Sequence, residues 1–236
     1  MNTCIIIMPI YNEEESLDKT FSEWKNETNK YQTDWKFDYL LVNDGSTDNT
    51  INIIKKIEQR NPNVKVIDKI NSGHGASCLL GYNYGLENKY NYIMQLDSDG
   101  QCDPVFFEKF LNKISQGKDI VYGIRYYRKD GILRFFISRI LSIIAFLKLG
   151  RWVWDPNVPY RIFKTKTVES FISKISKDYF LINVFLALHH KKSGIAYVPI
   201  VFRDRWGGSP SLNTFKIIQH GKTFIKQLRI FKTIDL

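Results

Sequence analysis

The sequence predicts an α/β protein with an open, mostly parallel, Rossmann-like sheet that is flanked by helices. Two features of the 236-residue chain predict this fold class. Short β-branched runs alternate with helical patterns through the first half, which implies right-handed crossovers between parallel strands. A polar cluster follows each of the first four runs, where ligand-binding loops stand in such sheets.

The expected strands are short runs rich in Val, Ile, Leu and Tyr. They are Cys4–Ile10, Tyr39–Asn43, Val64–Lys69, Tyr92–Leu96, Asp119–Arg125, Tyr160–Phe163 and Ile195–Phe202. The segments with helical patterns are Leu17–Lys30, Thr50–Arg60, Ala76–Glu87, Val105–Gln116, Asp178–His190 and Thr214–Phe231. No repeat or low-complexity linker interrupts the series, so the prediction is a single domain over residues 1–236.

One further segment, Ile132–Leu149, is rich in Ile, Leu and Phe but is interrupted by Arg134, Arg139 and Lys148. These cations disfavour a transmembrane helix, which needs about 20 consecutive apolar residues. On a helical wheel the arginines and Ser138 gather on one side and leave a broad apolar face. We therefore expect an amphipathic helix at a membrane interface. The alternative is a helix that faces the core of a soluble domain.

The composition sets the class of protein and the range of partners. With 44% hydrophobic and 25% charged residues, the chain can bury a core. It carries 34 Lys and Arg against 24 Asp and Glu, a net charge of +10. Such an excess attracts phosphorylated ligands, an anionic bilayer or nucleic acid, and does not choose among them.

The three cysteines, Cys4, Cys78 and Cys102, lie in or beside apolar stretches and lack metal-ligand spacing. We expect them to be reduced core residues, which fits a reducing compartment. The N-terminus runs into an apolar segment that ends at Pro9, without a basic leader or a cleavage site. No signal peptide is therefore expected.

The polar clusters after the first four strands carry the chemistry. They are Pro9–Glu13, Asn43–Asp48, Asn71–Ala76 and Asp97–Gln101. In the last cluster Asp97 and Asp99 can approach one pocket together. With the amide oxygen of Gln101 they form a hard oxygen set suited to Mg²⁺ or Mn²⁺ shared with a diphosphate. An isolated Asp-x-Asp also occurs in solvated turns.

Two clusters admit simpler explanations when they are taken singly. Asp44 could head a loop in which Ser46 or Thr47 caps the next helix. The glycines around His74 could be turn residues, or they could let backbone N–H groups meet an anion at the start of a helix. His74 by itself favours a structural role.

Together the four clusters resemble the nucleotide-sugar-binding half of the family 2 glycosyltransferases, which have the GT-A fold. The matching elements are Pro9-x-Tyr11-Asn12-Glu13, Asn43-Asp44-Gly45-Ser46-x-Asp48, Asn71-x-Gly73-x-Gly75-Ala76 and Asp97-x-Asp99-x-Gln101. They occur in the family's order within roughly the first 125 residues. The resemblance divides the domain into a nucleotide-sugar-binding half at 1–125, an acceptor half at 126–213 and a basic amphipathic helix at 214–236.

The resemblance implies roles for the first two clusters. Pro9, Tyr11 and Glu13 would hold the base and ribose of the donor, and Asp44 would contact the base. Asn43 stands where many relatives have an Asp, which leaves the identity of the base open.

The other two clusters would bind the diphosphate and its metal. Asp97 would lie near the ribose and the metal, and Asp99 and Gln101 would coordinate the divalent cation, Mg²⁺ or Mn²⁺. Gly73 and Gly75 would belong to the same nucleotide-sugar site.

The downstream half resembles a narrower group, the dolichol-phosphate mannose synthase-like enzymes and their bacterial polyprenyl-phosphate relatives. The matching segments are Gly123–Arg125, Arg134–Ser138, Asp155–Arg161 and Arg203–Ser211. In that group the positions of Arg125, Arg134 and Ser138 are expected to hold the phosphate of the lipid acceptor. Arg203 or Arg205 would face the diphosphate or the acceptor. Pro210 follows Ser209 where a Lys is common, which leaves the acceptor's identity open.

The expected reaction is an in-line displacement at the anomeric carbon with inversion, in which Arg205 helps to neutralise the leaving diphosphate. A polyprenyl-phosphate acceptor is already anionic and needs no strong base. A saccharide hydroxyl on a lipid-linked glycan or lipopolysaccharide needs a carboxylate to take its proton, and Asp178 is the candidate. A helix N-cap is the competing role for Asp178. Asp155 is structural or lies on the acceptor side.

The prediction is therefore a metal-dependent, hexosyltransferase-like enzyme on the cytoplasmic face of a membrane, with no nucleic-acid partner. The oligomeric state stays open. A nucleotidyltransferase is disfavoured because its first loop is usually rich in Gly and Arg, whereas Tyr11–Glu15 is acidic and lacks glycine. A non-enzymatic basic module that binds membranes or nucleic acid would explain the charge but not the four clusters.

Overall fold

The computed structural model describes residues 1–127, 139–140, 142–144, 146–147, 152–175, 179, 181–189, 194–207 and 223–231. Its seven strands form one sheet in the order β3-β2-β1-β4-β6-β5-β7. They are β1 (Asn2–Ile10), β2 (Trp35–Asn43), β3 (Val64–Asp68), β4 (Tyr92–Gln95), β5 (Ile120–Tyr127), β6 (Arg161–Lys164) and β7 (Ile195–Val201). The sheet is mostly parallel, as expected, and β6 runs antiparallel to both of its neighbours, β4 and β5.

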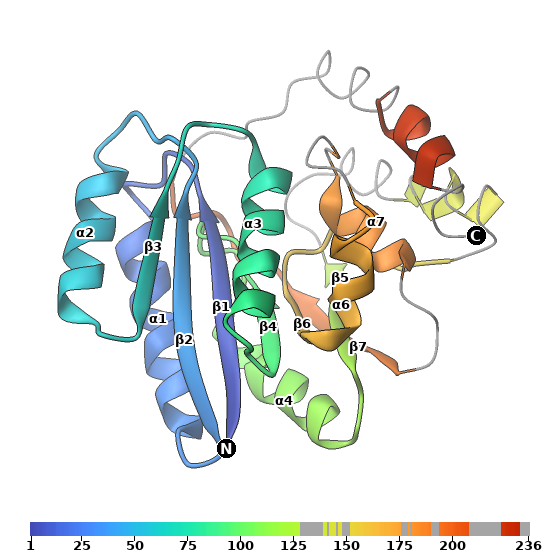
Figure 1. Ribbon diagram of the computed structural model, residues 1–236. Coiled ribbons are helices and arrows are strands. Elements are labelled where there is room, and N and C mark those ends of the chain that lie inside the picture. The colour runs from blue at the N-terminus through green and yellow to red at the C-terminus, as the bar shows by residue number, and fades with distance from the viewer. Residues whose placement is uncertain are drawn as a thin grey trace.

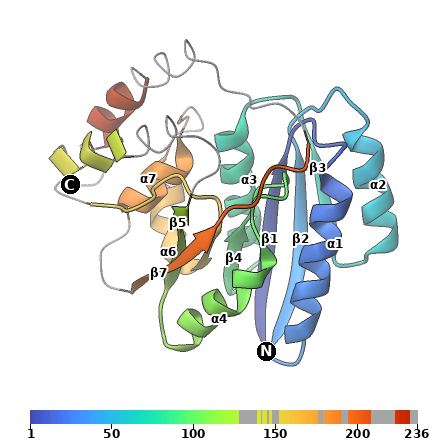
Figure 2. The same cartoon turned by 180° about the vertical axis from the view of Figure 1, so that it is seen from behind.

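Helices cover both faces of this sheet. They are α1 (Leu17–Thr28), α2 (Thr50–Arg60), α3 (His74–Glu87), α4 (Phe107–Ser115), α6 (Lys166–Ile172) and α7 (Ile182–His189), with short 3₁₀ turns at η1 (Asn29–Tyr31) and η2 (Pro104–Phe106). Helices α3, α6 and α7 lie on the face that is nearer the viewer in Figure 1, and α1 and α4 lie on the opposite face (Figure 2).

Strand β1 occupies the middle of the parallel half. It pairs with β2 from Asn2↔Trp35 to Ile10↔Asn43 and with β4 from Cys4↔Tyr92 to Ile7↔Gln95. A strand covered on both faces reads as a continuous apolar run rather than an alternation, which is why Cys4–Ile10 could be recognised from sequence. Because β1 and β2 end in register, their following loops start at the same level of the sheet.

Within the described residues, the predicted strands and helices are present with shifted boundaries, and the structure adds one short α-helix. Strand β2 begins four residues earlier than Tyr39, because Trp35 and Phe37 pair with the start of β1 and are buried. Helix α7 begins at Ile182 rather than Asp178, which is outside the described residues. Helix α6 was not predicted. Its pattern is weak, with only Val168 and Phe171 buried in two turns.

Close packing of α3 on the sheet depends on two small residues. A Cβ at Gly81 would lie 2.5 Å from Cγ2 of Ile7, and one at Gly85 would lie 2.6 Å from Cδ1 of Ile93. Both isoleucines are fully buried. The two glycines, one turn apart on the helix, therefore let its backbone approach β1 and β4 more closely than alanines would.

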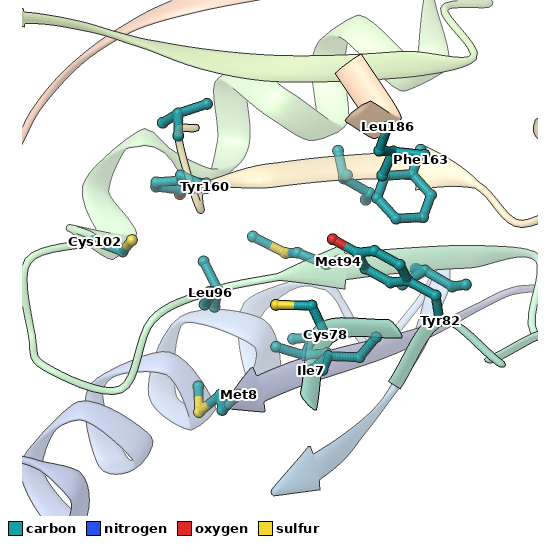
Figure 3. Close-up of a cluster of buried hydrophobic side chains, with 14 of the residues drawn as sticks. Ile7, Met8, Cys78, Tyr82, Met94, Leu96, Cys102, Tyr160, Phe163 and Leu186 are labelled. Atoms are coloured by element: carbon teal, nitrogen blue, oxygen red, sulfur yellow. The ribbon is translucent and has the colours of Figure 1, made fainter. Parts of the chain in front are cut away.

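The core fills the space between these layers (Figure 3). The residues buried there come from β1, α3, β4, β6 and α7, and include Ile7, Cys78, Met94, Phe163 and Leu186. All three cysteines are free and buried, as expected for reduced core residues.

The amphipathic segment lies partly outside the described residues. The described part of Ile132–Leu149 is helical at 139–140, 142–144 and 146–147. Of Thr214–Phe231, residues 223–231 are helical and pack Phe224 and Phe231 against Phe185 of α7, with ring centroids 5.5 and 5.2 Å apart. Within the described ranges, no helix is long and apolar enough to cross a bilayer.

The packing of α3 predicts that Gly81→Ala destabilises the protein, although alanine is the better helix former. The added methyl group overlaps Ile7, and overpacking of this kind lowers the free energy of unfolding by about 1–3 kcal/mol. Urea unfolding measures the change. Ile7→Ala frees the space, so the double variant should lose less than the sum of the two single losses. Strict additivity would contradict the close approach of α3 and β1.

Candidate functional site

The predicted polar clusters meet at the carboxyl ends of β1, β2 and β4. The loops after β1 and β2 are joined by Asn12, whose N–H donates to Oγ of Ser46 at 3.0 Å and whose Oδ1 accepts from the N–H of Thr47 at 2.8 Å. Asn12 has a φ of 53°, in the left-handed region that Asn tolerates better than most residues. The two loops therefore form one rigid rim.

Asp44 joins that rim to the loop after β3. Its buried carboxylate accepts from the N–H of Ser72 at 2.8 Å and of Gly73 at 2.9 Å, and it forms an ion pair with Lys69. Gly73 has a φ of 91°, which favours glycine. Asp44 thus fixes the glycine-rich loop at the start of α3.

The asparagine that precedes Asp44 has a structural explanation. Asn43 is buried, donates from Nδ2 to Oδ1 of Asp68 at 2.7 Å and accepts from Oγ of Ser46 at 2.6 Å. An Asp at this position would bring two carboxylates together. The amide removes that repulsion, because it can donate a hydrogen bond to Asp68.

Asp97 and Asp99 follow β4 and have opposite pKa shifts. Burial, and then the charge of Asp97, raise the pKa of Asp99 to about 7. For Asp97 burial acts in the same direction, but the hydrogen bond and charge of His74, with Arg125 and Arg205, lower its pKa below the usual value. Two carboxylates placed so that one resists ionisation form a site that favours a cation.

Arg205 reaches the same site from the segment after β7. It forms an ion pair with Glu13, and its Nε lies 3.8 Å from Oδ2 of Asp99. The buried Glu13 carboxylate also accepts from Oγ of Ser16 at 2.5 Å. Glu13 was expected beside the base and ribose, whereas here it holds Arg205 next to the two aspartates.

Trp206 anchors this segment to the turn that contains the aspartates. Its backbone N–H donates to the carbonyl of Asp99 at 3.3 Å, and the cations of Lys19 and Arg203 lie over its ring, 4.0 and 4.6 Å from the ring centroid. A Cβ at Gly100 would lie 2.5 Å from the Trp206 ring. Figure 2 shows the segment after β7 crossing towards the carboxyl ends of β1 and β2.

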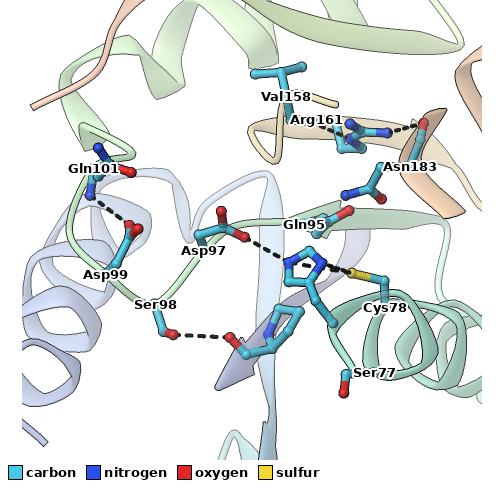
Figure 4. Close-up of polar contacts among 12 residues, drawn as sticks. Ser77, Cys78, Gln95, Asp97, Ser98, Asp99, Gln101, Val158, Arg161 and Asn183 are labelled. Atoms are coloured by element: carbon cyan, nitrogen blue, oxygen red, sulfur yellow. Dashed lines mark hydrogen bonds and ion pairs between the residues drawn. The ribbon is translucent and has the colours of Figure 1, made fainter. Parts of the chain in front are cut away.

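Arg203 and Gln101 take different directions from those expected. Arg203 donates to the carbonyl of Gly100 at 3.1 Å and pairs with Glu23 at 2.8 Å, on the outer side of the turn. The Gln101 amide points towards the carbonyl of Arg203 at 3.4 Å, and Figure 4 places it away from Asp97. Of the two late arginines, only Arg205 lies beside the aspartates.

Arg125 is held by Asp155. The guanidinium donates to both carboxylate oxygens at 2.7 Å and stacks on Phe202, 5.1 Å from the ring centroid. Behind it, the fully buried Arg161 donates to the carbonyls of Val158 at 2.8 Å and Asn183 at 3.1 Å (Figure 4). Arg161 therefore fixes the loop that presents Asp155.

The remaining predicted residues are accounted for as follows. Pro9 is the last residue but one of β1 and its carbonyl accepts from Oγ of Ser98 at 3.0 Å, Tyr11 is half-exposed at the rim, and Gly75 lies in the first turn of α3. Arg134, Ser138 and Asp178 lie outside the described residues.

Several site residues were missed by sequence reasoning. Lys69 belongs to no motif that was weighed, Arg161 and Trp206 lie in matching segments but were assigned no role, and His74 was given a structural role. The proximity of Trp206 to the Gly100 turn could have been suspected, because a large aromatic follows two arginines in a glycine-rich segment. The partner of Arg161 could not, since backbone carbonyls leave no sequence signal.

The chain matches the family model for glycosyl transferase family 2 over residues 5–176. It is 28% identical to the uncharacterized glycosyltransferase YkcC of Bacillus subtilis over 82% of its own length, and it spans 59% of that protein. It is 28% identical to the uncharacterized protein MJ0544 of Methanocaldococcus jannaschii, with 94% and 97% of the two chains covered. It is 24% identical to the polyprenol monophosphomannose synthase of Mycolicibacterium smegmatis, with 85% and 77% covered.

Among solved structures, a glucosyl-3-phosphoglycerate synthase from Mycobacterium tuberculosis, in complex with Mn²⁺ and UDP-glucose, has a similar fold. The TM-score is 0.68 at 16% identity, and the match covers 99% of this chain and 80% of that one. The mixed sheet with β6 antiparallel inside it is therefore a GT-A fold. With its family model matched over residues 5–176 and the four motif clusters brought together at one edge of the sheet, the chain belongs to glycosyl transferase family 2.

Proposed function

We propose that the chain transfers a sugar from a nucleoside diphosphate-sugar to a polyprenyl-phosphate-type lipid acceptor, with inversion, at a membrane surface. The observation that carries the donor half of this proposal is the grouping of Asp97, Asp99 and Arg205 beyond β4. The acceptor half is supported by the likeness to the polyprenol monophosphomannose synthase. That it is an enzyme of glycosyl transfer follows from its family.

The residues present fit a divalent cation. Asp97 and Asp99 offer hard oxygen ligands, and burial, followed by the charge of Asp97, raises the pKa of Asp99, so a bound cation would favour the ionised carboxylate. Within the described residues, no group of three or more His, Cys, Asp or Glu side chains could hold a metal by itself. Two carboxylates suit an ion that shares its coordination with a diphosphate, as Mg²⁺ usually does. Such an ion would neutralise charge on the leaving group.

The chain's own residues would bind and neutralise the donor. The backbone N–H groups at the start of α3, near Gly75, would donate to the diphosphate, and Asp44 fixes the loop that precedes them. Tyr11 and Pro9 border the place for the base and ribose. Arg205, held by Glu13, would donate to the diphosphate as negative charge develops on it.

The acceptor side is built on Arg125. Its bidentate pairing with Asp155 fixes the guanidinium, and fixed arginines bind phosphate with two parallel hydrogen bonds. In the proposal an incoming lipid phosphate is contacted by Arg125 together with Arg134 and Ser138. A phosphate monoester is anionic at neutral pH, so no general base is assigned.

An exposed apolar stripe supports docking on a membrane. Ile140, Ile143 and Leu147 lie at helical spacing and are 53%, 46% and 75% exposed. Ser142 on the same helix is buried and donates to the carbonyl of Val153 at 2.8 Å. A helix that turns its polar side inward and its apolar side outward is suited to the interface of a bilayer.

The donor site predicts how Asp99→Asn changes ligand binding. In a thermal-shift series with UDP, GDP, CDP and dTDP, each with Mn²⁺, Mg²⁺ or EDTA, one or two diphosphates should raise the melting temperature of the wild type, and by more with metal than in EDTA. Asp99→Asn should lose the metal-dependent part, and sugar transfer with it. A wild type that no diphosphate stabilises would contradict the proposed donor site.

The same variant tests the charge of the site without ligand. The folded state holds the Asp99 proton more tightly than the unfolded chain does, so its ionisation costs stability as pH rises from about 4 to about 7. At pH 8 without metal, Asp99→Asn should therefore melt a few degrees above the wild type, and at pH 4 the difference should vanish. A variant that melts lower at pH 8 would contradict the charge repulsion.

The two late arginines should behave differently when they are truncated. Arg205→Ala removes a cation beside the leaving group, and kcat for transfer should fall about a hundredfold or more. Arg203→Ala removes the contacts to Glu23 and Gly100, so it should lower the melting temperature and change kcat far less. Equal losses of kcat in both would mean that Arg205 acts only by holding the segment in place.

The apolar stripe predicts membrane binding that charged substitutions in the stripe should weaken. Flotation with liposomes that contain an anionic lipid should recover the wild type, and Ile143→Asp/Leu147→Asp should weaken binding by at least about tenfold, because each side chain loses its burial in lipid. Val105→Asp, at an exposed apolar position on η2, is the matched control. Binding that survives the double change would remove the stripe from the proposal.

A further inference from the structure

His74 lies between a carboxylate of the site and a buried thiol. Its Nε2 is 3.1 Å from Oδ1 of Asp97, and its Nδ1 is 3.6 Å from Sγ of Cys78, one turn further along α3. Figure 4 shows Asp97 on its loop facing the turn of α3 that carries Cys78. The imidazole therefore bridges a rigid helix and the loop that follows β4.

The two contacts use both nitrogens of the ring. A carboxylate accepts, so Nε2–H is the donor to Asp97, and Nδ1 faces the Cys78 thiol. Cys78 is fully buried in the core, so its contact with Nδ1 restrains the orientation of the imidazole ring. One hydrogen bond sets the orientation of His74, and the other transmits it to Asp97.

The Asp97 side chain needs such a restraint more than the Asp99 side chain does. Strand β4 ends at Gln95, so Asp97 stands outside the hydrogen-bonded ladder, and its side chain is 31% exposed. His74 is the one hydrogen-bond partner of this carboxylate within the part of the chain that the structure describes. Asp99 is more buried and accepts from the N–H of Gln101 at 3.1 Å. Without His74, the Asp97 side chain is free to rotate.

We infer that His74 is a positioning residue for Asp97: it holds one carboxylate oxygen so that the other faces the cation of the donor site. This inference rests on the proposed function and deepens it. It also explains why a histidine, rather than another loop residue, stands between Gly73 and Gly75. A group anchored on a helix orients a ligand that lies on a loop, and outer hydrogen bonds of this kind are typically worth 10- to 100-fold in metal affinity.

Binding of Mn²⁺, followed by electron paramagnetic resonance on the full chain, tests the inference without relying on turnover. Free Mn²⁺ is titrated alone and then with UDP or GDP present. His74→Ala should weaken Mn²⁺ binding about tenfold or more. His74→Gln keeps an N–H donor and should recover part of the affinity. His189→Ala, a histidine on α7 that is bonded to Ser170, should bind as the wild type does.

Kinetics separate positioning from direct contact with the donor. A positioning role raises the Mn²⁺ concentration needed for half-maximal rate, while the affinity for the nucleotide in EDTA stays unchanged. A loss of nucleotide affinity in EDTA would instead make His74 a direct donor ligand and overturn the inference. Folded His74→Ala with wild-type Mn²⁺ affinity would also overturn it.

The inference and the proposed function fail in different ways. If the wild type binds neither Mn²⁺ nor any of the nucleoside diphosphates, the proposed donor site is wrong and the inference falls with it. If the wild type binds both, and His74→Ala and His74→Gln bind them equally well, only the role of His74 is lost.

Discussion

The structure depends on the position of β1 between β2 and β4. Because β1 is paired on both edges and covered on both faces, it sets the level at which the loops after β1, β2 and β4 begin. Helix α3 can lie against it only because Gly81 and Gly85 bring no side chain into the contact. That close packing in turn places His74, the first residue of α3, within reach of Asp97. The geometry of the site is thus a consequence of how tightly one helix packs on one strand.

The site brings several negatively charged side chains close together, which is unfavourable for stability. Glu13, Asp97 and Asp99 gather around Arg205, and burial with charge repulsion keeps the pKa of Asp99 high. Such an arrangement costs stability, and the rest of the fold compensates through hydrogen bonds that fix each loop. Asp44 secures the glycine-rich loop, and Trp206 secures the segment that carries Arg205. The cation and diphosphate of the proposed function would offset part of this cost when they bind.

Arginines in this chain serve two kinds of purpose, and sequence alone does not separate them. Arg205 lies beside the aspartates, whereas Arg203, two residues earlier, turns outward to Glu23. Arg161 is fully buried and donates to backbone carbonyls, so it stabilises the loop that carries Asp155. In a regular strand residues two apart face the same side, so the different directions of Arg203 and Arg205 follow from the irregular backbone after β7, which the sequence does not reveal.

The sequence by itself determined the order of strands and helices in the first half, the free buried cysteines, and the four clusters at the carboxyl edge. These follow from local patterns: apolar runs mark buried strands, and polar residues mark the loops that must remain open to ligand. Tertiary structure alone decided that Glu13 pairs with Arg205, that Gln101 turns to Arg203, and that His74 links Cys78 to Asp97. It also decided that β6 runs antiparallel between β4 and β5. Apart from the contact of His74 with Cys78 one turn along α3, these contacts join residues that are far apart in the sequence, and no periodicity records which distant side chain fills a given partner's hydrogen-bonding capacity.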